Sequence, residues 1–192
     1  TGHNDTDARN FSYKNGKYFY ASSKSDSGQK CQIFSSDNLL QWTKAHTSTN
    51  TNFNGGNSWP QGIVIVNNLI LLKCGYSIAT SIDNGNTWAD DLTKKGNYSK
   101  SIVYFNGNYF LIAGDPSKSG PMYDSLFHLY KSSNGSSWEK VFPQQVKINY
   151  MFADSKIYLL GDNGQLIHSD DGINWNVKRV TGQSLNYMTK LN

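Results

Sequence analysis

Short stretches in which apolar and polar residues alternate recur along the chain, and turn residues interrupt each of them. Residues 11–19 match residues 102–110 position by position, and both stretches have Asn-Gly at the centre. Asn-Gly between alternating hydrophobic residues is typical of a tight hairpin, so each stretch predicts two antiparallel strands. Asn67-Asn68 and Asp154-Ser155 fill the same turn position in two further stretches. The pattern therefore predicts four hairpins.

A second pattern follows each hairpin and ends in tryptophan. Residues 81–88 have the spacing Ser-x-Asp-x-Gly-x-x-Trp. Asp83 can accept hydrogen bonds from turn amides, and Gly85 can adopt a positive φ without steric cost. Trp88 opens the next strand with a large ring that favours burial. This segment predicts a third strand, a tight turn and a fourth strand.

Three partial copies of this segment occur at residues 35–42, 131–138 and 168–175, at intervals of roughly 40 to 50 residues. The first has Leu39 at the glycine position, the second has Ser133 at the aspartate position, and the third has His168 at the serine position. The residues assigned to the four turns are Asp37, Trp42, Ser81, Asp83, Gly85, Trp88, Gly135, Trp138, Asp170, Gly172 and Trp175.

The four segments resemble the Asp-box, also called the bacterial neuraminidase repeat. In that family the box joins the third and fourth strands of each blade of a β-propeller. The resemblance implies an all-β fold, a β-propeller of four-stranded antiparallel blades with Asp-box turns. It implies one domain over residues 1–192, with blades near residues 10–50, 60–95, 100–143 and 147–182. The family includes sialidases, other glycosidases, assembly factors, receptors and binding modules, so fold alone leaves the function open.

The end of the chain repeats the beginning of the fourth blade. Leu185-Asn186-Tyr187-Met188 matches Ile148-Asn149-Tyr150-Met151. Residues 184–192 are therefore predicted to form the first strand of a fifth repeat, or a strand that closes a sheet elsewhere.

Composition excludes several classes of partner. The net charge is +4, but the lysines are spread along the chain, whereas a nucleic-acid site would gather them. No apolar run reaches the roughly 20 residues that span a membrane, so no membrane insertion is expected. Cys31 and Cys74 are predicted to be free buried thiols. The histidines, His3, His46, His128 and His168, show no metal-ligand spacing, so no metal or cofactor is predicted.

Chain direction sorts the connections of such a blade between two faces. The hairpin turns and box turns lie on one face, and the long connections at residues 22–29, 46–61 and 114–125 lie on the other. Loops on a rigid scaffold commonly carry binding, although loops without a role are the alternative. Aromatic faces with amide and carboxylate groups suit carbohydrate recognition. The candidate ligand-binding residues are Asp26, Phe53, Asn57, Trp59, Asp115, Lys118, Tyr123 and Asp124.

The sequence gives less support to the hypothesis that the protein is an enzyme. Family sialidases hold a substrate carboxylate with three arginines and use a tyrosine nucleophile with a carboxylate, whereas this chain has only Arg9, Arg179 and the single glutamate Glu139. Another glycosidase would need two carboxylates about 5–10 Å apart, which the loop aspartates could supply. The pairs Asp90-Asp91 and Asp170-Asp171 are interpreted as turn or solvated residues.

The sequence thus favours a non-enzymatic binding module that attaches to a host surface or carbohydrate through the long loops. This interpretation rests on a resemblance to propellers of phage tail and bacterial surface proteins. It implies a cell-surface glycan or protein receptor as partner, self-association or other subunits as further partners, and a virion or extracellular location. A structural role in a virion or secreted complex, and a glycoside hydrolase with loop aspartates, are the two alternatives.

Overall fold

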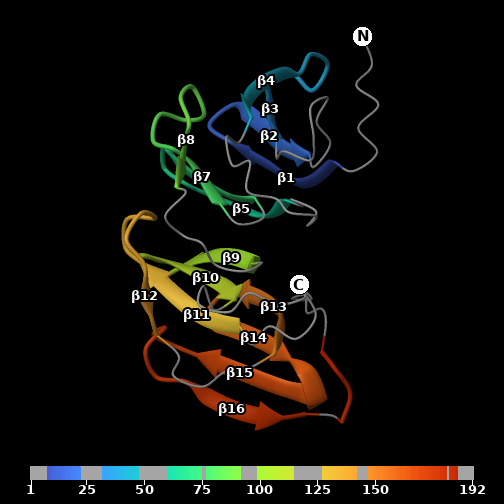
Figure 1. Cartoon of the computed structure of the whole chain (residues 1–192), viewed down its shortest axis with the longest axis vertical. Coiled ribbons are helices and arrows are strands. Elements are labelled where there is room, and N and C mark those ends of the chain that lie inside the picture. Colours follow the sequence, from blue (N-terminus) through green and yellow to red (C-terminus); the bar gives the residue numbers. More distant parts are fainter. Residues whose placement is uncertain are drawn as a thin grey trace. The chain divides into compact units, whose positions relative to one another are not determined.

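The computed structural model describes residues 8–22, 32–47, 60–74, 77–91, 99–114, 127–141, 147–180 and 182–185. Every regular element in this part of the chain is a strand, apart from a three-residue 3-10 turn, η1 (Asp162–Gly164). The strands form four sheets of four strands each (Figure 1). Strands consecutive in the sequence are neighbours in every sheet and run antiparallel, as the sequence predicts.

The sheets are numbered in chain order. Sheet 1 contains β1 (Ala8–Lys14), β2 (Lys17–Ser22), β3 (Gln32–Ser36) and β4 (Thr43–Thr47). Sheet 2 contains β5 (Pro60–Val66), β6 (Leu69–Cys74), β7 (Ser77–Ser81) and β8 (Ala89–Asp91). Sheet 3 contains β9 (Ser99–Phe105), β10 (Asn108–Gly114), β11 (Phe127–Ser132) and β12 (Glu139–Lys140). Sheet 4 contains β13 (Ile148–Ala153), β14 (Ile157–Gly161), β15 (Gln165–Ser169) and β16 (Asn176–Arg179).

The predicted hairpin turns have the backbone that Asn-Gly favours. Asn15 and Gly16 have φ values of 51° and 79°, and Asn106 and Gly107 have values of 45° and 76°. Two successive positive φ angles give a turn whose twist matches that of the strands on either side. The turn of sheet 4 is one residue longer than the other three, since Ala153 pairs with Ile157, and Asp154 N–H donates within it to the carbonyl of Lys156 at 2.9 Å. All four sheets therefore begin with the hairpin that the sequence predicts.

The chain forms two compact units, Thr1–Lys95 and Gly96–Asn192. The first unit contains sheets 1 and 2, and its strand β1 lies against β5. The second contains sheets 3 and 4, and β9 lies against β13. Each unit is thus a pair of sheets that pack face to face, with their first strands adjacent.

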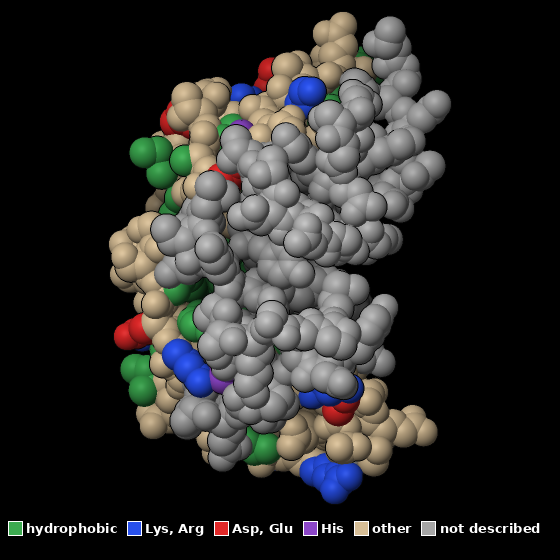
Figure 2. All heavy atoms as spheres, in the orientation of Figure 1, with side chains coloured by type: hydrophobic (Ala, Val, Ile, Leu, Met, Phe, Trp, Pro, Cys, Tyr) green, Lys and Arg blue, Asp and Glu red, His purple; other side chains and the backbone are tan. Residues whose placement is uncertain are grey.

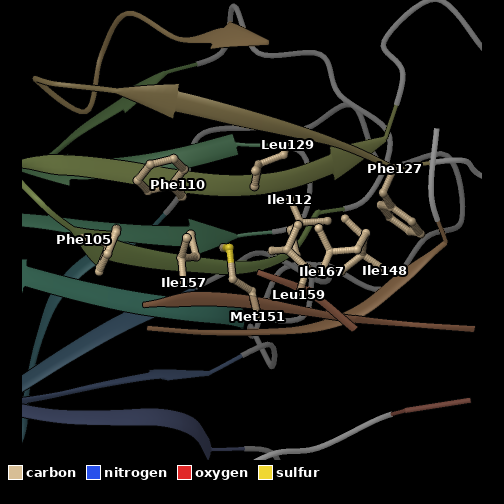
Figure 3. Packing of buried hydrophobic residues seen from close by; sticks show 10 residues of the cluster. All are labelled: Phe105, Phe110, Ile112, Phe127, Leu129, Ile148, Met151, Ile157, Leu159 and Ile167. Atoms are coloured by element: carbon tan, nitrogen blue, oxygen red, sulfur yellow. The ribbon is translucent and has the colours of Figure 1, made fainter. Parts of the chain in front are cut away.

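Each unit has its own hydrophobic core between its two sheets. In the second unit, side chains from sheets 3 and 4 interdigitate around Ile112, Met151 and Leu159 (Figure 3). The core residues of the first unit are Phe19, Ala21, Ile33, Ile70, Leu72 and Ala79, with Trp88 packed against them. Residues of these two cores occupy alternate positions along β2, β6 and β14, because successive side chains of a strand point to opposite faces, and Leu71 and Leu160 on the other face are buried as well. This alternation buries one face of each sheet against its neighbour.

A glycine of one sheet makes room for a phenylalanine of the other in both units. A Cβ built on Gly85 of sheet 2 would lie 2.5 Å from Cε1 of Phe19 in sheet 1. A Cβ built on Gly172 of sheet 4 would lie 2.5 Å from Cζ of Phe110 in sheet 3. Both glycines also have a positive φ, 83° and 73°. The glycine therefore serves the turn and the contact between sheets together.

Candidate functional site

The turn between the third and fourth strands, called here the box turn, binds its own backbone through side chains. In sheet 2, Ser81 Oγ accepts from Gly85 N–H at 2.8 Å and donates to Asp83 Oδ1 at 2.8 Å. Asp83 Oδ1 also accepts from Thr87 N–H at 2.8 Å, and Oδ2 accepts from the Thr87 hydroxyl at 2.6 Å. The Thr87 hydroxyl and amide hold the pKa of Asp83 down, at about 2. Asp83 is thus committed to the turn.

The other three box turns are one residue shorter than predicted, which corrects two assignments. In sheet 4 the backbone amides of residues 173 and 174 donate to Asp171 at 2.8 Å each, so Asp171 and not Asp170 is the acceptor. In sheet 1 the acceptor is Asn38 and not Asp37, at 2.9 and 3.1 Å from the amides. In sheet 3 it is Asn134, at 2.9 Å from two amides.

The physical reason for the correction is the position of the buried serine. Ser36, Ser132 and Ser169 are buried at the end of the third strand, and each bonds the side chain two residues further on. Asp170 lies between Ser169 and its acceptor Asp171 in the sequence, and it forms an ion pair with Lys156 at 2.6 Å. The predicted residues Gly135, Trp138, Gly172 and Trp175 do lie in the turns, and the Trp138 indole N–H donates to the Gly135 carbonyl at 3.1 Å.

Replacing each of the two neighbouring aspartates of sheet 4 by alanine, one at a time, tests this correction. Asp171→Ala is expected to lower the melting temperature clearly, because it removes the acceptor of two backbone amides and of the Asn174 side chain. Asp170→Ala removes only a solvent-exposed ion pair and should change the melting temperature little. Thermal unfolding followed by circular dichroism measures both. A larger effect for Asp170→Ala would contradict the assignment.

Hydrogen bonds gather the hairpin turns and box turns of each unit at one end of its sheets, called here the turn end. In sheet 2, Asn84 N–H donates to the Asn68 carbonyl at 3.0 Å. Lys17 of sheet 1 donates to Asn86 of sheet 2 at 3.3 Å, and Asn106 of sheet 3 donates to the Asp170 carbonyl of sheet 4 at 3.2 Å. The opposite end of each sheet is called the loop end.

The three long connections join strands at the loop end. They comprise residues 23–31, 48–59 and 115–126, and all three ranges lie outside the described residues. The predicted ligand-binding residues fall in them, so these assignments stay predictions: Asp26, Phe53, Asn57, Trp59, Asp115, Lys118, Tyr123 and Asp124. His3, the side chains of Cys31 and Cys74, and residues 186–192 of the proposed fifth repeat also lie outside the described part.

Near the loop end of the first unit, a histidine and an aspartate join the two sheets. His46 Nε2 of β4 lies 3.0 Å from Oδ1 of Asp90 in β8, and the Asp90 side chain is only 4% exposed. The His46 ring stacks on Trp88 with 5.9 Å between ring centroids. Asp90 is therefore not the solvated residue that the sequence suggested. The sequence contained no signal for this pair, because 44 positions separate its members.

At the loop end of the second unit, Asp162 holds the chain that leaves sheet 4. Its carboxylate accepts from the Asn149 amide at 2.8 Å, from the Lys147 ammonium at 2.9 Å and from the Ser184 hydroxyl at 2.9 Å. These donors, the Asn149 amide foremost, hold the pKa of Asp162 down at about 2. Leu185 N–H donates to the Gly161 carbonyl at 3.0 Å. Residues 184 and 185 thus lie against sheet 4 without forming a strand there.

Other kinds of site are not evident in the described residues. No three His, Cys, Asp or Glu side chains among them come together as metal ligands would. None of their helical residues belongs to a helix that could cross a membrane. The described Lys and Arg side chains visible in Figure 2 lie apart from one another.

Comparisons with known proteins bear on the fold. No family model and no curated protein matches the chain. Among solved structures, an inactive variant of virginiamycin B lyase from Staphylococcus aureus, bound to quinupristin, has a TM-score of 0.65 at 9% identity, covering 92% of this chain and 56% of that one. The Pan2 WD40 domain of Neurospora crassa has a TM-score of 0.60 at 10% identity, covering 95% and 53%. A GH32 β-fructofuranosidase of Bombyx mori has a TM-score of 0.51 at 16% identity, covering 90% and 48%.

The fold is of the β-propeller type. The chain spans about half the length of these propeller structures. At such low identity the likeness shows the fold alone, and the similar proteins include both enzymes and a WD40 domain. Propeller architecture therefore does not decide between catalysis and binding.

Proposed function

We propose that this propeller is a non-enzymatic binding module that attaches to a cell-surface glycan through its loop end. The observation that supports this most is the difference between the two ends of the sheets, which carry short, self-bonded turns at one end and long connections at the other. At the turn end, the box turns bond their polar groups to their own backbone. The long connections, which carry aromatic, amide and carboxylate residues, all belong to the loop end. A rigid scaffold with variable loops at one end suits recognition.

The composition of these connections supports a carbohydrate as the ligand. Sugar rings present apolar C–H faces and many hydroxyl groups, so they favour aromatic side chains flanked by amide and carboxylate groups. Trp59 is the one tryptophan of the chain that is not in a box turn, and Phe53 and Asn57 precede it in the same connection. The third long connection combines Tyr123 with Asp115 and Asp124. These residues carry the proposal.

We further assign the chain to the Asp-box propellers. Support comes from the box turns, each of which has a serine two residues before a carboxylate or amide acceptor and ends at a tryptophan. In that family the box joins the third and fourth strands of each blade, which agrees with the commitment of Asp83 and Asp171 to the backbone amides of this turn. A virion or extracellular location, as for surface attachment proteins, follows from this assignment as an expectation.

An assembly role is the second candidate, and the outer face of sheet 1 favours it. Phe11 and Tyr13 are 58% and 56% exposed, and both contact the ring of Tyr18. Contiguous exposed apolar side chains often mark a surface that binds another protein. The glycoside hydrolase alternative depends on Asp26, Asp115 and Asp124, all in the long connections.

Binding to a glycan array, followed by titration calorimetry, tests the proposed function. Trp59→Ala is expected to weaken binding about tenfold or more, since a ring stacked on the ligand contributes on the order of 1–2 kcal/mol. Leu40→Ala is the matched control, because Leu40 is 86% exposed in the box turn of sheet 1 and lies far along the strands from the loop end. The proposal fails if no glycan binds, if Trp59→Ala binds normally, or if the bound glycan is cleaved.

A further inference from the structure

A small hollow lies at the loop end of sheet 4. Its volume is about 290 Å³, and its lining residues are Asn163, Gln165, Val177, Lys178 and Arg179. They come from η1, from the first residue of β15 and from the last three residues of β16. All of them except the apolar Val177 carry N–H donors on their side chains. The hollow is therefore cationic and rich in donors.

The guanidinium of Arg179 is oriented by the backbone. Its Nε–H donates to the carbonyl of Asn163 at 2.9 Å. Asn163 has a positive φ of 55° within η1, and the Val180 N–H bond to the Gly164 carbonyl, 2.9 Å long, fixes the end of β16 beside it. One edge of the guanidinium is thus held, while its terminal nitrogens carry four further N–H groups. A guanidinium held in this way loses less conformational entropy when it binds an anion.

The positive charge of the hollow is not neutralised by the described residues around it. Neither Lys178 nor Arg179 forms an ion pair with a described carboxylate. Asp162 precedes Asn163 in the chain, but its oxygens are occupied by Lys147, Asn149 and Ser184. An oxyanion in the hollow would therefore meet the Arg179 guanidinium without a competing carboxylate from the described residues.

We propose that this hollow binds the sulfate or carboxylate group of an acidic saccharide. The terminal N–H groups of Arg179 match two oxygens of such a group, and the amide of Gln165, the residue paired with Arg179 across the two strands, adds a donor. Val177, which is half exposed, offers an apolar contact to the C–H groups of the sugar ring. The inference rests on the proposed glycan binding and gives it a ligand class, an acidic rather than a neutral sugar. The volume suits about one charged sugar residue.

The test compares chitotriose with its O-sulfated form, by titration calorimetry at fixed ionic strength. The wild-type chain is expected to prefer the sulfated form about tenfold or more. Arg179→Gln should abolish this preference and leave the binding of chitotriose unchanged, and Arg179→Lys should restore less than half of it, because lysine lacks the fork. Lys44→Gln is the matched control, since it removes one exposed lysine from sheet 1. Equal binding of both forms by the wild type, a preference that survives Arg179→Gln, or an equal loss in Lys44→Gln would overturn the inference.

A second readout separates this inference from the proposed function. The NMR signal of Arg179 Nε–H should shift with sulfated chitotriose and not with chitotriose. If inorganic sulfate shifts this signal equally at the same concentration, the hollow takes an adventitious ion only and the saccharide inference is wrong. If chitotriose binds, depends on Trp59 and shows no sulfate preference, the proposed function stands and the inference fails. If neither form binds while sulfate shifts the signal, both fail as saccharide proposals.

Discussion

Gly172→Ala is expected to destabilise the second unit by about 2–5 kcal/mol. The left-handed backbone at this position costs an alanine about 1–2 kcal/mol. The added methyl group would lie 2.5 Å from Cζ of Phe110, and moving a buried ring to accommodate it costs about 1–3 kcal/mol. Gly107→Ala is the matched control, because Gly107 has a similar φ of 76° with no atom within 4 Å of the added carbon. Urea unfolding of the three proteins measures the difference.

A double-mutant cycle with Phe110→Ala isolates the steric part of this effect. Phe110→Ala alone should cost about 3–5 kcal/mol, because the ring is 1% exposed and its loss leaves a cavity. The cavity also makes room for the methyl group at position 172, so the double variant should cost less than the two single variants together. Strict additivity would mean that the glycine serves the turn alone.

Leu72→Ala and Leu159→Ala are each expected to cost about 2–5 kcal/mol, the range found for buried leucines. Leu72 lies in β6 and Leu159 in β14, and both are fully buried in the core of their own unit. Val177→Ala in β16 is the control, because this side chain is half exposed, so its truncation should change stability by less than about 0.5 kcal/mol.

The pair of leucine variants also tests how the two units unfold. Hydrogen exchange resolves local opening along the chain. Because each unit has a core of its own, Leu72→Ala is expected to raise exchange in β5–β7, and Leu159→Ala in β13–β15. Equal acceleration of both regions by either variant would mean that the units unfold as one cooperative body.

Local chemistry made the strands and turns predictable. Asn-Gly is favoured in few backbone conformations, so residues 15–16 and 106–107 fixed the hairpins and the alternation on either side fixed the faces. The tryptophan at the end of each box turn gave the spacing of the sheets. These signals need no contact distant in the sequence, and they were enough to predict four antiparallel sheets.

The exact acceptor of the shorter box turns was not predictable in the same way. Asp170-Asp171, Asp37-Asn38 and Ser133-Asn134 each offer two adjacent polar residues of similar capping ability. Which of them faces the amides depends on which serine ends the buried strand, and packing against the other sheet decides that. A comparison of Ser36, Ser132 and Ser169 with Ser81 would have found the shorter spacing, because all four serines precede their acceptor by two positions.

Contacts between distant residues account for the rest. His46 pairs with Asp90 only because strands of two different repeats, β4 and β8, lie side by side. No pattern within one repeat contains such pairs. For the ligand-binding residues in the long connections, the sequence remains the basis of the assignment.

Leu39 limits how these repeats can be rearranged. In the box turn of sheet 1, Leu39 occupies the position that Gly85 and Gly172 occupy in sheets 2 and 4. It has a positive φ of 65°, and its side chain is 46% exposed. A shuffled chain that set sheet 1 directly after sheet 3, in the place of sheet 4, would drive this side chain into Phe110. Protein engineers who use the repeats as exchangeable building blocks would have to change Leu39 to glycine first.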